Sequence, residues 1–262
     1  MSESLLLPGE RIDDLQLQGL KIIQSPASFR FGMDAVLLSD FAQVKPGSRV
    51  CDLGTGTGIL PLLLLGRAEN VTCDAVEIQI ASADQARRTM ILNDLTDRVT
   101  IHNRDLKEAR DFLPHAAFDL VISNPPYSRS DAALHSPNPA LRLARTEGEC
   151  RLEDVIRAAA YLLRGKGRFA FMLPAARLPE ALEALRVFRL EPKRLRTVHA
   201  RADRPARLCL IEAMLDVRPG LTVEPPLIVK TPDGEDTEEI KRIYHQPLTK
   251  QGGYAHDKKE IR

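Results

Sequence analysis

The residues with the clearest chemical potential are Asn124, Pro125, Pro126 and Tyr127, which follow the apolar run 118–123 directly. Proline donates no N–H to a sheet and restricts the residue before it to extended backbone, so the chain leaves the strand in a stiff shape. The Asn124 side-chain carbonyl and the Pro125 backbone carbonyl can accept the two N–H groups of a planar amine. The Tyr127 ring can stack on the ring that bears this amine. This stretch therefore offers two carbonyl acceptors and a ring at a strand end, which could hold such an amine, although Asn-Pro and Pro-Pro are also ordinary turn formers.

A second chemical motif is the glycine-rich turn "DLGTGTG", which follows the strand-like residues "RVC" at 49–51. Glycines at the carboxyl end of a strand let the backbone approach a ligand. The spacing is not the dinucleotide pattern G-x-G-x-x-G, and no G-K-[ST] of a P-loop is present. The acid at position 52 would repel a pyrophosphate and attract an ammonium group. We therefore expect a cofactor site built from Asp52, Gly54, Thr55, Gly56, Thr57 and Gly58.

Two further acids follow the next two expected strands. Glu77 can accept hydrogen bonds from two ribose hydroxyls, and Asp105, with Leu106 beside it, can accept from an exocyclic amine. Three acids at three adjacent strand ends suit an amino-acid group, a ribose and an adenine, which S-adenosylmethionine combines. Each acid taken alone fits a solvated loop carboxylate or a helix cap equally well. Asp34 can likewise cap the helix expected near Met33.

The elements that would position these residues alternate between strand and helix patterns, which predicts a mostly parallel sheet with helices on both faces. The last two strands have no helix between them and predict an antiparallel hairpin, so we expect seven strands in a Rossmann-like α/β fold. Leu152, Val155, Ile156, Ala159 and Leu163 follow helical spacing, with Gly165 as a possible cap. The expected strands are 49–53, 71–78, 98–102, 118–123, 167–174, 194–200 and 207–215, and the expected helices are 58–66, 80–94, 152–163 and 177–188.

The remaining segments extend this core into one predicted domain over 1–245. Residues 1–45 are expected to form a hairpin, within 15–24, and a helix; 46–217 form the cofactor-binding core; and 218–245 form an extended arm and a short helix. The polar, basic residues 246–262 are predicted to be a disordered tail.

Charge balance, apolar run length and cysteine spacing limit the classes of partner, cofactor and location that the sequence supports. The chain of 262 residues has 37 basic and 36 acidic residues, so bulk charge gives no reason to expect nucleic acid or a membrane as partner. The N-terminus lacks the basic region of a signal peptide, and the longest apolar run is too short to cross a bilayer, which favours the cytoplasm. Cys51, Cys73, Cys150 and Cys209 contain no C-x-x-C pair, so we expect neither zinc nor disulfides.

The motifs carry a resemblance to known enzymes. The turn 52–58 together with Glu77 resembles motif I and the motif II acid of class I methyltransferases, and "NPPY" resembles motif IV of enzymes that methylate adenine N6, cytosine N4 or protein glutamine. The whole chain resembles the bacterial family of tRNA adenine-N6 methyltransferases that modify tRNA-Val beside the anticodon. The matching pieces are "FRFGMDAVLLSDF", "CDLGTGTGIL", "ISNPPY", "LARTEGECRLEDVIRAAAYLL" and "PPLIV…DG…TEEIKRIY".

This resemblance implies S-adenosylmethionine as cofactor, tRNA as partner, no metal, and a target adenine flipped into the pocket. "FGMD" resembles the segment that closes over the cofactor in this family, which implies a contact of Asp34 with its methionine end, as an alternative to the helix cap. Candidate RNA contacts are Arg142 and Arg145 in the loop after "NPPY", and Arg194 and Arg196 in the basic C-terminal hairpin. The chain departs from the family pattern at Thr146, where histidine is expected. Alternatives are methylation of a protein glutamine or of ribosomal RNA adenine, and a non-catalytic protein that binds the cofactor and RNA.

Overall fold

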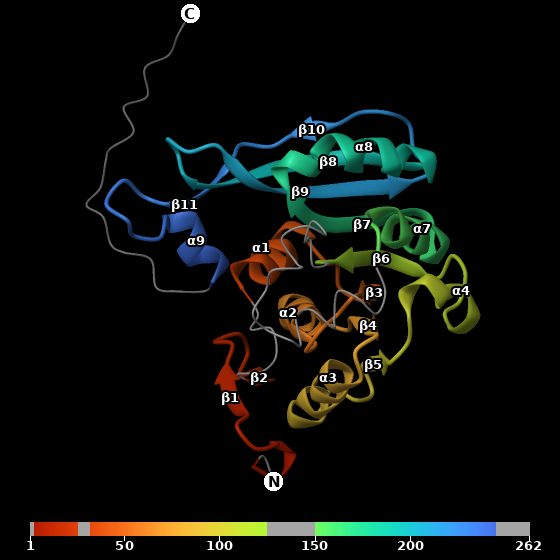
Figure 1. Cartoon of the computed structure of the whole chain (residues 1–262), viewed down its shortest axis with the longest axis vertical. Coiled ribbons are helices and arrows are strands. Elements are labelled where there is room, and N and C mark those ends of the chain that lie inside the picture. The colour runs from red at the N-terminus through yellow and green to blue at the C-terminus, as the bar shows by residue number, and fades with distance from the viewer. Residues whose placement is uncertain (1–2, 26–31, 125–149, 245–262) are drawn as a thin grey trace, which may run out of the picture.

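The computed structural model describes residues 3–25, 32–124 and 150–244. Within these residues one sheet of nine strands forms the centre of the molecule (Figure 1). Its order is β10 (Thr222–Val223), β8 (Leu190–Arg201), β9 (Ala206–Leu215), β7 (Leu163–Pro174), β6 (Phe118–Ser123), β3 (Arg49–Leu53), β4 (Thr72–Val76) and β5 (Val99–His102), and β11 (Leu227–Lys230) also pairs with β8.

The directions of the strands confirm the Rossmann-like prediction. Strands β7, β6, β3, β4 and β5 are parallel, and β9 runs antiparallel to both β7 and β8. The seven expected strands are therefore present, with the expected hairpin at one end. The two short strands β10 and β11 are additional and pair in parallel with the outer edge of β8. They satisfy backbone groups that an open edge would leave unpaired.

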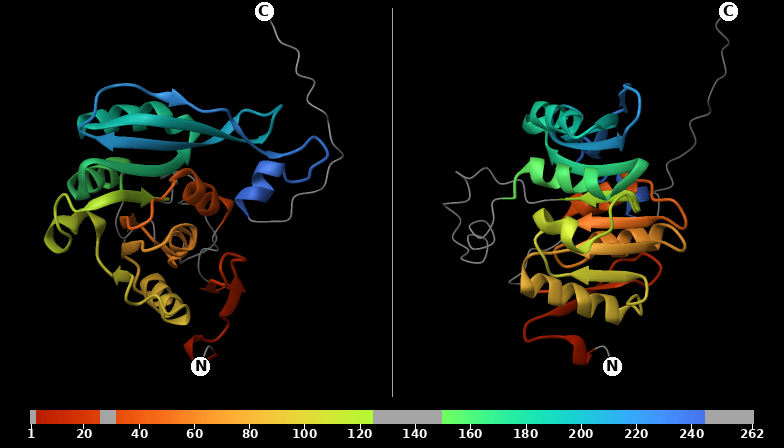
Figure 2. Two further views of the ribbon diagram at one scale, coloured as in Figure 1. Left: turned by 180° about the vertical axis from the view of Figure 1, so that it is seen from behind. Right: turned by 90° about the vertical axis from the view of Figure 1, so that its right-hand side faces the viewer.

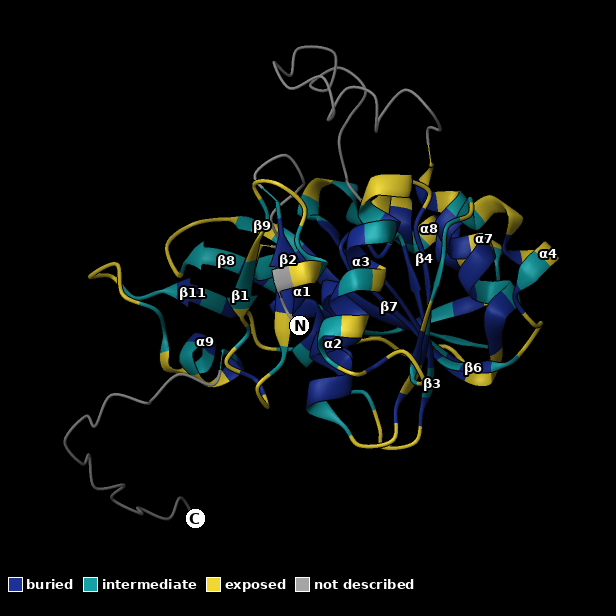
Figure 3. Cartoon of the chain, turned by 90° about the horizontal axis from the view of Figure 1, so that it is seen from below, coloured by how far each residue is buried: buried dark blue, intermediate teal, exposed yellow. Residues whose placement is uncertain are grey.

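Helices cover both faces of the sheet and enclose two apolar cores (Figures 2 and 3). The first face carries α1 (Met33–Phe41), α2 (Ile59–Arg67), α3 (Ile80–Leu92) and α9 (Glu238–Ile243). The second face carries α4 (Ala109–Phe112), α7 (Leu152–Leu162) and α8 (Leu178–Val187). The strands between the two layers are apolar over most of their length, because parallel strands are buried on both sides.

A two-stranded hairpin, β1 (Arg11–Asp14) and β2 (Lys21–Gln24), lies beside α3. Ile22 and Ile23 of β2 are fully buried, and the Gln85 side chain of α3 donates to the Ile23 carbonyl at 2.6 Å. Arg88 donates to Glu10 at 2.9 Å and ties the start of the hairpin to the same helix. The hairpin was expected within 15–24, but its first strand lies earlier and residues 15–20 form the connection.

Two helix boundaries also differ from expectation. Helix α7 ends at Leu162, and Leu163 already has extended backbone and begins β7, so Gly165 lies inside a strand and caps nothing. The expected linker after β5 contains η2 (Leu106–Glu108) and α4, and η3 (Ala175–Arg177) precedes α8. A short 3-10 helix, η1 (Glu3–Leu5), precedes the hairpin.

A buried ionic cluster anchors the end of α1 to the sheet. Glu212 of β9 accepts hydrogen bonds from Arg168 of β7 at 2.8 Å and from Arg194 of β8 at 3.4 Å. Arg168 also donates to the Ala42 carbonyl at 2.8 Å, and Arg194 to the Phe41 carbonyl at 3.1 Å. The last carbonyls of a helix lack partners within the helix, so these two arginines satisfy them. The cluster therefore fixes the C-terminal end of α1.

We expect Glu212→Gln to destabilise the fold by roughly 2–4 kcal/mol, because removing one charge of a buried group leaves its partners uncompensated. The measurement is urea or thermal unfolding. Asp216→Asn is the matched control, since its ion pair with Arg189 is largely exposed and such pairs contribute little. Equal stability of the two variants would contradict the anchoring role of Glu212.

Candidate functional site

The carboxyl ends of β4, β3 and β6 form the centre of the candidate site. The chain passes from β3 to β4 and β5 on one side, and places β6 and β7 on the other. In open α/β sheets such a switch in direction opens a crevice at the carboxyl ends of the strands, where ligands bind. Asp52 pairs in register with Ile122, so Asn124 lies two residues further along the neighbouring strand. The structure thus brings the glycine turn and the start of "NPPY" to adjacent strand ends.

The turn after β3 has the backbone that its glycines predict. Gly54, Gly56 and Gly58 have φ of 80°, 58° and 86°, which is the left-handed region that favours glycine. Among the described residues, no atom outside the neighbouring positions lies within 4 Å of a Cβ added at Gly54 or Gly56, so both face space that these residues leave open. A Cβ on Gly58 would approach Met90 Cε of α3 to 2.9 Å. The first two glycines therefore leave room for a ligand, and the third allows α2 to pack against α3.

Asp52 is fully buried at the end of β3, and neither of its carboxylate oxygens has a hydrogen-bond partner among the described residues. The Thr55 hydroxyl, also buried, lacks a well-aligned partner there too. Burial raises the pKa of Asp52 from 3.8 to about 7. The nearby Thr55 hydroxyl, although not aligned for a good hydrogen bond, lowers it in part, and the negative charge of Glu77 adds a smaller increase. A buried polar group without partners costs free energy, so this carboxyl fits a site for a cationic ligand group.

Glu77 lies at the next strand end and is likewise buried. Its carboxylate accepts hydrogen bonds from the Gly56 N–H at 2.9 Å and the Gln79 N–H at 2.8 Å, which binds the glycine turn to the end of β4. Burial raises its pKa, and these backbone N–H groups oppose that shift. Each carboxylate oxygen can accept more than one hydrogen bond, so Glu77 retains capacity for ligand hydroxyls.

The remaining expected cofactor residues lie around the same edge. Asp105, after β5, accepts from the Lys107 N–H at 2.9 Å and so caps η2, while Leu106 is half-buried. Asp34 is in the first turn of α1 and is also half-buried. Burial raises the pKa of Asp34, and the positive charge of Arg207 opposes this. Asp105 therefore acts as a helix cap. The N-cap residue of α1 is Gly32, and no side-chain hydrogen bond caps that helix, so Asp34 is not its cap.

Of the amine clamp, the structure describes Asn124, which is half-buried immediately after β6. The preceding Ser123 is fully buried and its hydroxyl donates to the Leu53 carbonyl at 2.7 Å, which ties the ends of β6 and β3 together. Pro125, Pro126 and Tyr127, and with them Arg142, Arg145 and Thr146, lie outside the described residues.

The structure does not bring Arg194 and Arg196 to a free surface. Arg194 donates to Glu224 at 2.6 Å and stacks over the Phe41 ring at 4.3 Å, in addition to its contacts in the ionic cluster. Arg196 donates to both carboxylate oxygens of Glu239, at 2.9 and 2.8 Å, and to the Pro225 carbonyl. Their side chains are only 20% and 15% exposed. These internal partners argue against the expected role of both arginines in RNA contact.

Two residues near the site were not among the sequence candidates. Asn103 donates from its side-chain amide to the Glu77 carbonyl at 2.9 Å and the Ile78 carbonyl at 3.0 Å, and so fixes the loop after β4. Ile78 itself is 49% exposed at the strand end beside Glu77. An apolar side chain exposed next to an acid at a ligand-binding edge is suited to pack against a flat ring. The sequence signal was their adjacency to Asp105 and Glu77.

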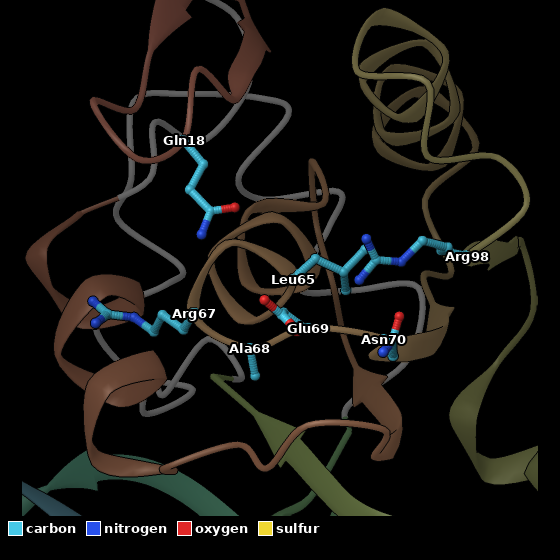
Figure 4. A pocket seen from close by; sticks show the side chains of 7 residues that line it. All are labelled: Gln18, Leu65, Arg67, Ala68, Glu69, Asn70 and Arg98. Atoms are coloured by element: carbon cyan, nitrogen blue, oxygen red, sulfur yellow. The ribbon is translucent and has the colours of Figure 1, made fainter.

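Two open pockets lie at the opposite edge of the sheet. The first has a cavity volume of about 370 Å³ and is lined by Gln18, Leu65, Arg67, Ala68, Glu69, Asn70 and Arg98 (Figure 4). Asn70 and Arg98 precede β4 and β5, so this pocket is at the amino ends of the strands. A second, of about 300 Å³, includes Lys45, before β3, and Lys166, in the first part of β7. Both are remote from Asp52 and Asn124.

The described ranges contain no cluster of three histidine, cysteine, aspartate or glutamate side chains placed to hold a metal ion. No helix in those ranges combines the length and hydrophobicity needed to span a bilayer.

Comparison with known proteins adds the family. Residues 31–175 match the methyltransferase small domain, a segment that contains Asp34, Asp52, Glu77, Asp105 and Asn124. A tRNA1(Val) (adenine(37)-N6)-methyltransferase of Porphyromonas gingivalis is 30% identical over 206 residues, which is 76% of this chain and 80% of that protein. One of the same name from Serratia proteamaculans is 32% identical over 221 residues, 82% of each chain.

Solved structures support the fold. The crystal structure of a predicted O-methyltransferase from Agrobacterium tumefaciens superposes with a TM-score of 0.68 at 22% identity, covering 81% of this chain and 96% of that one. By its sequence relatives and its methyltransferase small domain, the chain belongs to the tRNA1(Val) (adenine(37)-N6)-methyltransferase family.

Proposed function

We propose that this protein transfers a methyl group from S-adenosylmethionine to the exocyclic N6 of an adenine in tRNA. The observation that carries the proposal is the placement of Asp52 and Asn124. A buried carboxyl that has no hydrogen-bond partner in the described part of the chain stands beside the glycine turn, and an amide side chain follows on the neighbouring strand. Neighbouring strands are only about 5 Å apart, so a cation held by Asp52 and an amine held by Asn124 would be close together. The names of the relatives agree with this arrangement.

The residues present fit the cofactor. Asp52 would accept from its ammonium group, which would end the isolation of the buried carboxyl. Glu77 would accept from the ribose hydroxyls, and Asp105 and Leu106 would contact the adenine. Bound there, S-adenosylmethionine supplies an activated methyl group. Around it we propose further contacts from Asp34 and from the turn residues Gly54, Thr55, Gly56, Thr57 and Gly58.

Asn124 would act on the target amine. The lone pair of adenine N6 is delocalised into the ring, so the nitrogen is a poor nucleophile. Acceptance of its N–H groups by the Asn124 side chain and the Pro125 carbonyl would orient it and favour a more tetrahedral nitrogen as the new bond forms. The proton becomes acidic only at that stage, so no strong base is required. Ser123, held by the Leu53 carbonyl, keeps this strand end in place, and Tyr127 would stack on the base.

The wider organisation follows from the same interpretation. Residues of the N-terminal hairpin and of α9 share one buried cluster with α1 and α2, which supports a single domain over 1–245. We propose that the protein acts in the cytoplasm, where tRNA is modified, and the lack of a membrane-spanning helix among the described residues agrees with this. A protein glutamine, a ribosomal RNA adenine and a non-catalytic cofactor-binding role remain the alternatives.

The direct test of the proposal is methyl transfer from labelled S-adenosylmethionine. We expect label in an unmodified tRNA transcript, recovered as N6-methyladenosine after nuclease digestion. Label in ribosomal RNA or in release-factor protein, with none in tRNA, would favour one of the other acceptors. Tight cofactor binding with no transfer to any of the three would favour the non-catalytic alternative.

Asp52→Asn should change stability and cofactor affinity in opposite directions. The folded state raises the pKa of Asp52 to about 7, so the free protein loses stability as pH rises from about 4 to 7. At pH 8 the ionised carboxyl costs on the order of 4 kcal/mol, at about 1.4 kcal/mol for each pH unit. The neutral amide avoids this cost but leaves its own polar atoms unpaired, at roughly 1–3 kcal/mol. We therefore expect Asp52→Asn without ligand to melt several degrees higher than the parent protein at pH 8.

The same variant should bind S-adenosylmethionine at least about 10-fold more weakly, since a charge-assisted hydrogen bond contributes roughly 1.5–3 kcal/mol. Calorimetry and thermal melting on one preparation measure both effects. Asp97→Asn, at an exposed carboxyl of the opposite edge, is the control and should change neither. Parent-like cofactor affinity in Asp52→Asn would exclude Asp52 as the partner of the ammonium group.

Asn124→Ala should chiefly lower kcat, because the lost contact matters most as the nitrogen becomes tetrahedral. Loss of one preorganised polar contact costs on the order of 100- to 1000-fold in comparable sites. Cofactor affinity should be retained, since Asp52 and Glu77 are unchanged. Single-turnover methylation separates this from a purely structural turn, which would lower the melting temperature and leave the rate per folded molecule near that of the parent.

A further inference from the structure

The tip of the β8–β9 hairpin, residues 199–207, projects past the carboxyl edge of the sheet (Figure 1). Ser123, at the end of β6, is level with Phe171 of β7, which is level with Ile211 of β9. The turn at Asp203 and Arg204 is seven to eight residues beyond Ile211. At about 3.3 Å per residue, the tip extends roughly 20 Å past the start of the amine clamp. It is therefore on the side of the sheet where a substrate of Asn124 must approach.

The tip carries three arginines and one acid. Arg204 is 68% exposed and Arg201 43% exposed, and both lie near Asp203, at 3.9 and 3.3 Å. Arg207, at the start of β9, is exposed, and among the described residues no carboxylate forms an ion pair with it. Exposed pairs of this kind contribute little, so these arginines remain available to another anion.

The contrast with the rest of the hairpin is sharp. Arg194 and Arg196, on the same strand β8, are held by Glu212, Glu224 and Glu239. The arginines of this hairpin thus divide into an inner pair that stabilises the fold and a tip set, Arg201, Arg204 and Arg207, that does not.

Acidic residues on one side of the tip would repel a polyanion, so they indicate that it binds on the other side. The turn after β11 contains Asp233, Glu235 and Asp236, and Asp236 pairs with Lys230 at 3.0 Å. In the sheet order β11 is next to β8, and β9 is on the other side of β8, towards β7 and β6. Arg207 of β9 is therefore on the side nearer Asn124, and the acids are on the far side. The positive charge of Arg207 also reaches Asp34 of α1, at the same edge as the cofactor residues.

We propose that Arg201, Arg204 and Arg207 at the hairpin tip bind the phosphate backbone of the RNA substrate outside the pocket while the target base is held at Asn124. This inference rests on the proposed function and names a surface within it. Phosphate contacts set the position of a nucleic acid without reading its sequence, and guanidinium groups suit them. A projection of roughly 20 Å places these contacts on nucleotides several positions away from the base that enters the pocket.

The test is the salt dependence of binding to an unmodified tRNA transcript, measured by fluorescence anisotropy. Arg201→Gln with Arg204→Gln, which leaves Arg207 and its charge near Asp34 in place, should reduce the slope of log K against log salt by about 1.4–1.8 and weaken binding at low salt roughly 10- to 50-fold. KM for tRNA should rise, and kcat at saturating tRNA should stay near that of the parent. S-adenosylmethionine affinity, measured by calorimetry, should be unchanged and shows that the site remains folded.

The matched control is Lys45→Gln with Lys166→Gln, which removes two exposed charges at the opposite edge of the sheet. We expect its slope to equal that of the parent. An unchanged slope in the arginine variant, with normal tRNA methylation by the parent, would overturn the hairpin-tip surface and leave the proposed function intact. A larger loss of slope in the lysine control than in the arginine variant would indicate that the RNA binds at the opposite edge, and would overturn the hairpin-tip surface. A parent that binds and methylates no tRNA would overturn both.

Discussion

A carboxyl group that is buried at the end of β3, with no hydrogen-bond partner among residues 3–25, 32–124 and 150–244, is the constraint around which this molecule is arranged. Asp52 is tolerable there because its pKa rises towards neutrality, and because the turn after it leaves space where an added Cβ would meet none of the described atoms. Glu77 holds that turn from the neighbouring strand, and Ser123 joins the strand on the other side. Three strand ends are thus fixed relative to one another before any ligand is bound, which is what preorganisation of a transfer site requires.

The same edge depends on contacts made far from it. Helix α1 presents Asp34 at its first turn, at the carboxyl edge of the sheet, whereas its last carbonyls are held by Arg168 and Arg194 near the other edge. Because Glu212 pairs with both arginines, the strands that hold the end of α1 also define the position of its start. Arg194 of the C-terminal hairpin therefore supports the site indirectly, because it helps to fix the position of α1.

The features that were predictable from the sequence are those encoded locally. The alternation of strand and helix patterns gave the parallel order, and the rule that ligands lie at carboxyl ends placed Asp52, Glu77, Asp105 and Asn124 at one edge. Pairing of β10 and β11 with β8 was not predictable, because strands of two and four residues are too short for a periodicity that would assign them a partner. The roles of Arg194 and Arg196 were missed since their acceptors, Glu224 and Glu239, are 30 and 43 residues away in the chain. Charge clusters in a sequence do not reveal which members are neutralised in the fold.

The hydrogen bond from Arg67 to the Ile243 carbonyl joins residues 176 positions apart. Leu227, Val229, Ile240 and Ile243 complete the buried cluster that α1 and α2 begin. During synthesis, the part of the apolar surface of α1 and α2 that contacts these residues stays uncovered until the last part of the chain has been made. Contacts of such long sequence separation slow folding and expose partly folded chains to aggregation. The residues that complete this first core are therefore the last to leave the ribosome. Chaperone binding to the nascent protein would have its greatest effect on the face that carries α1 and α2.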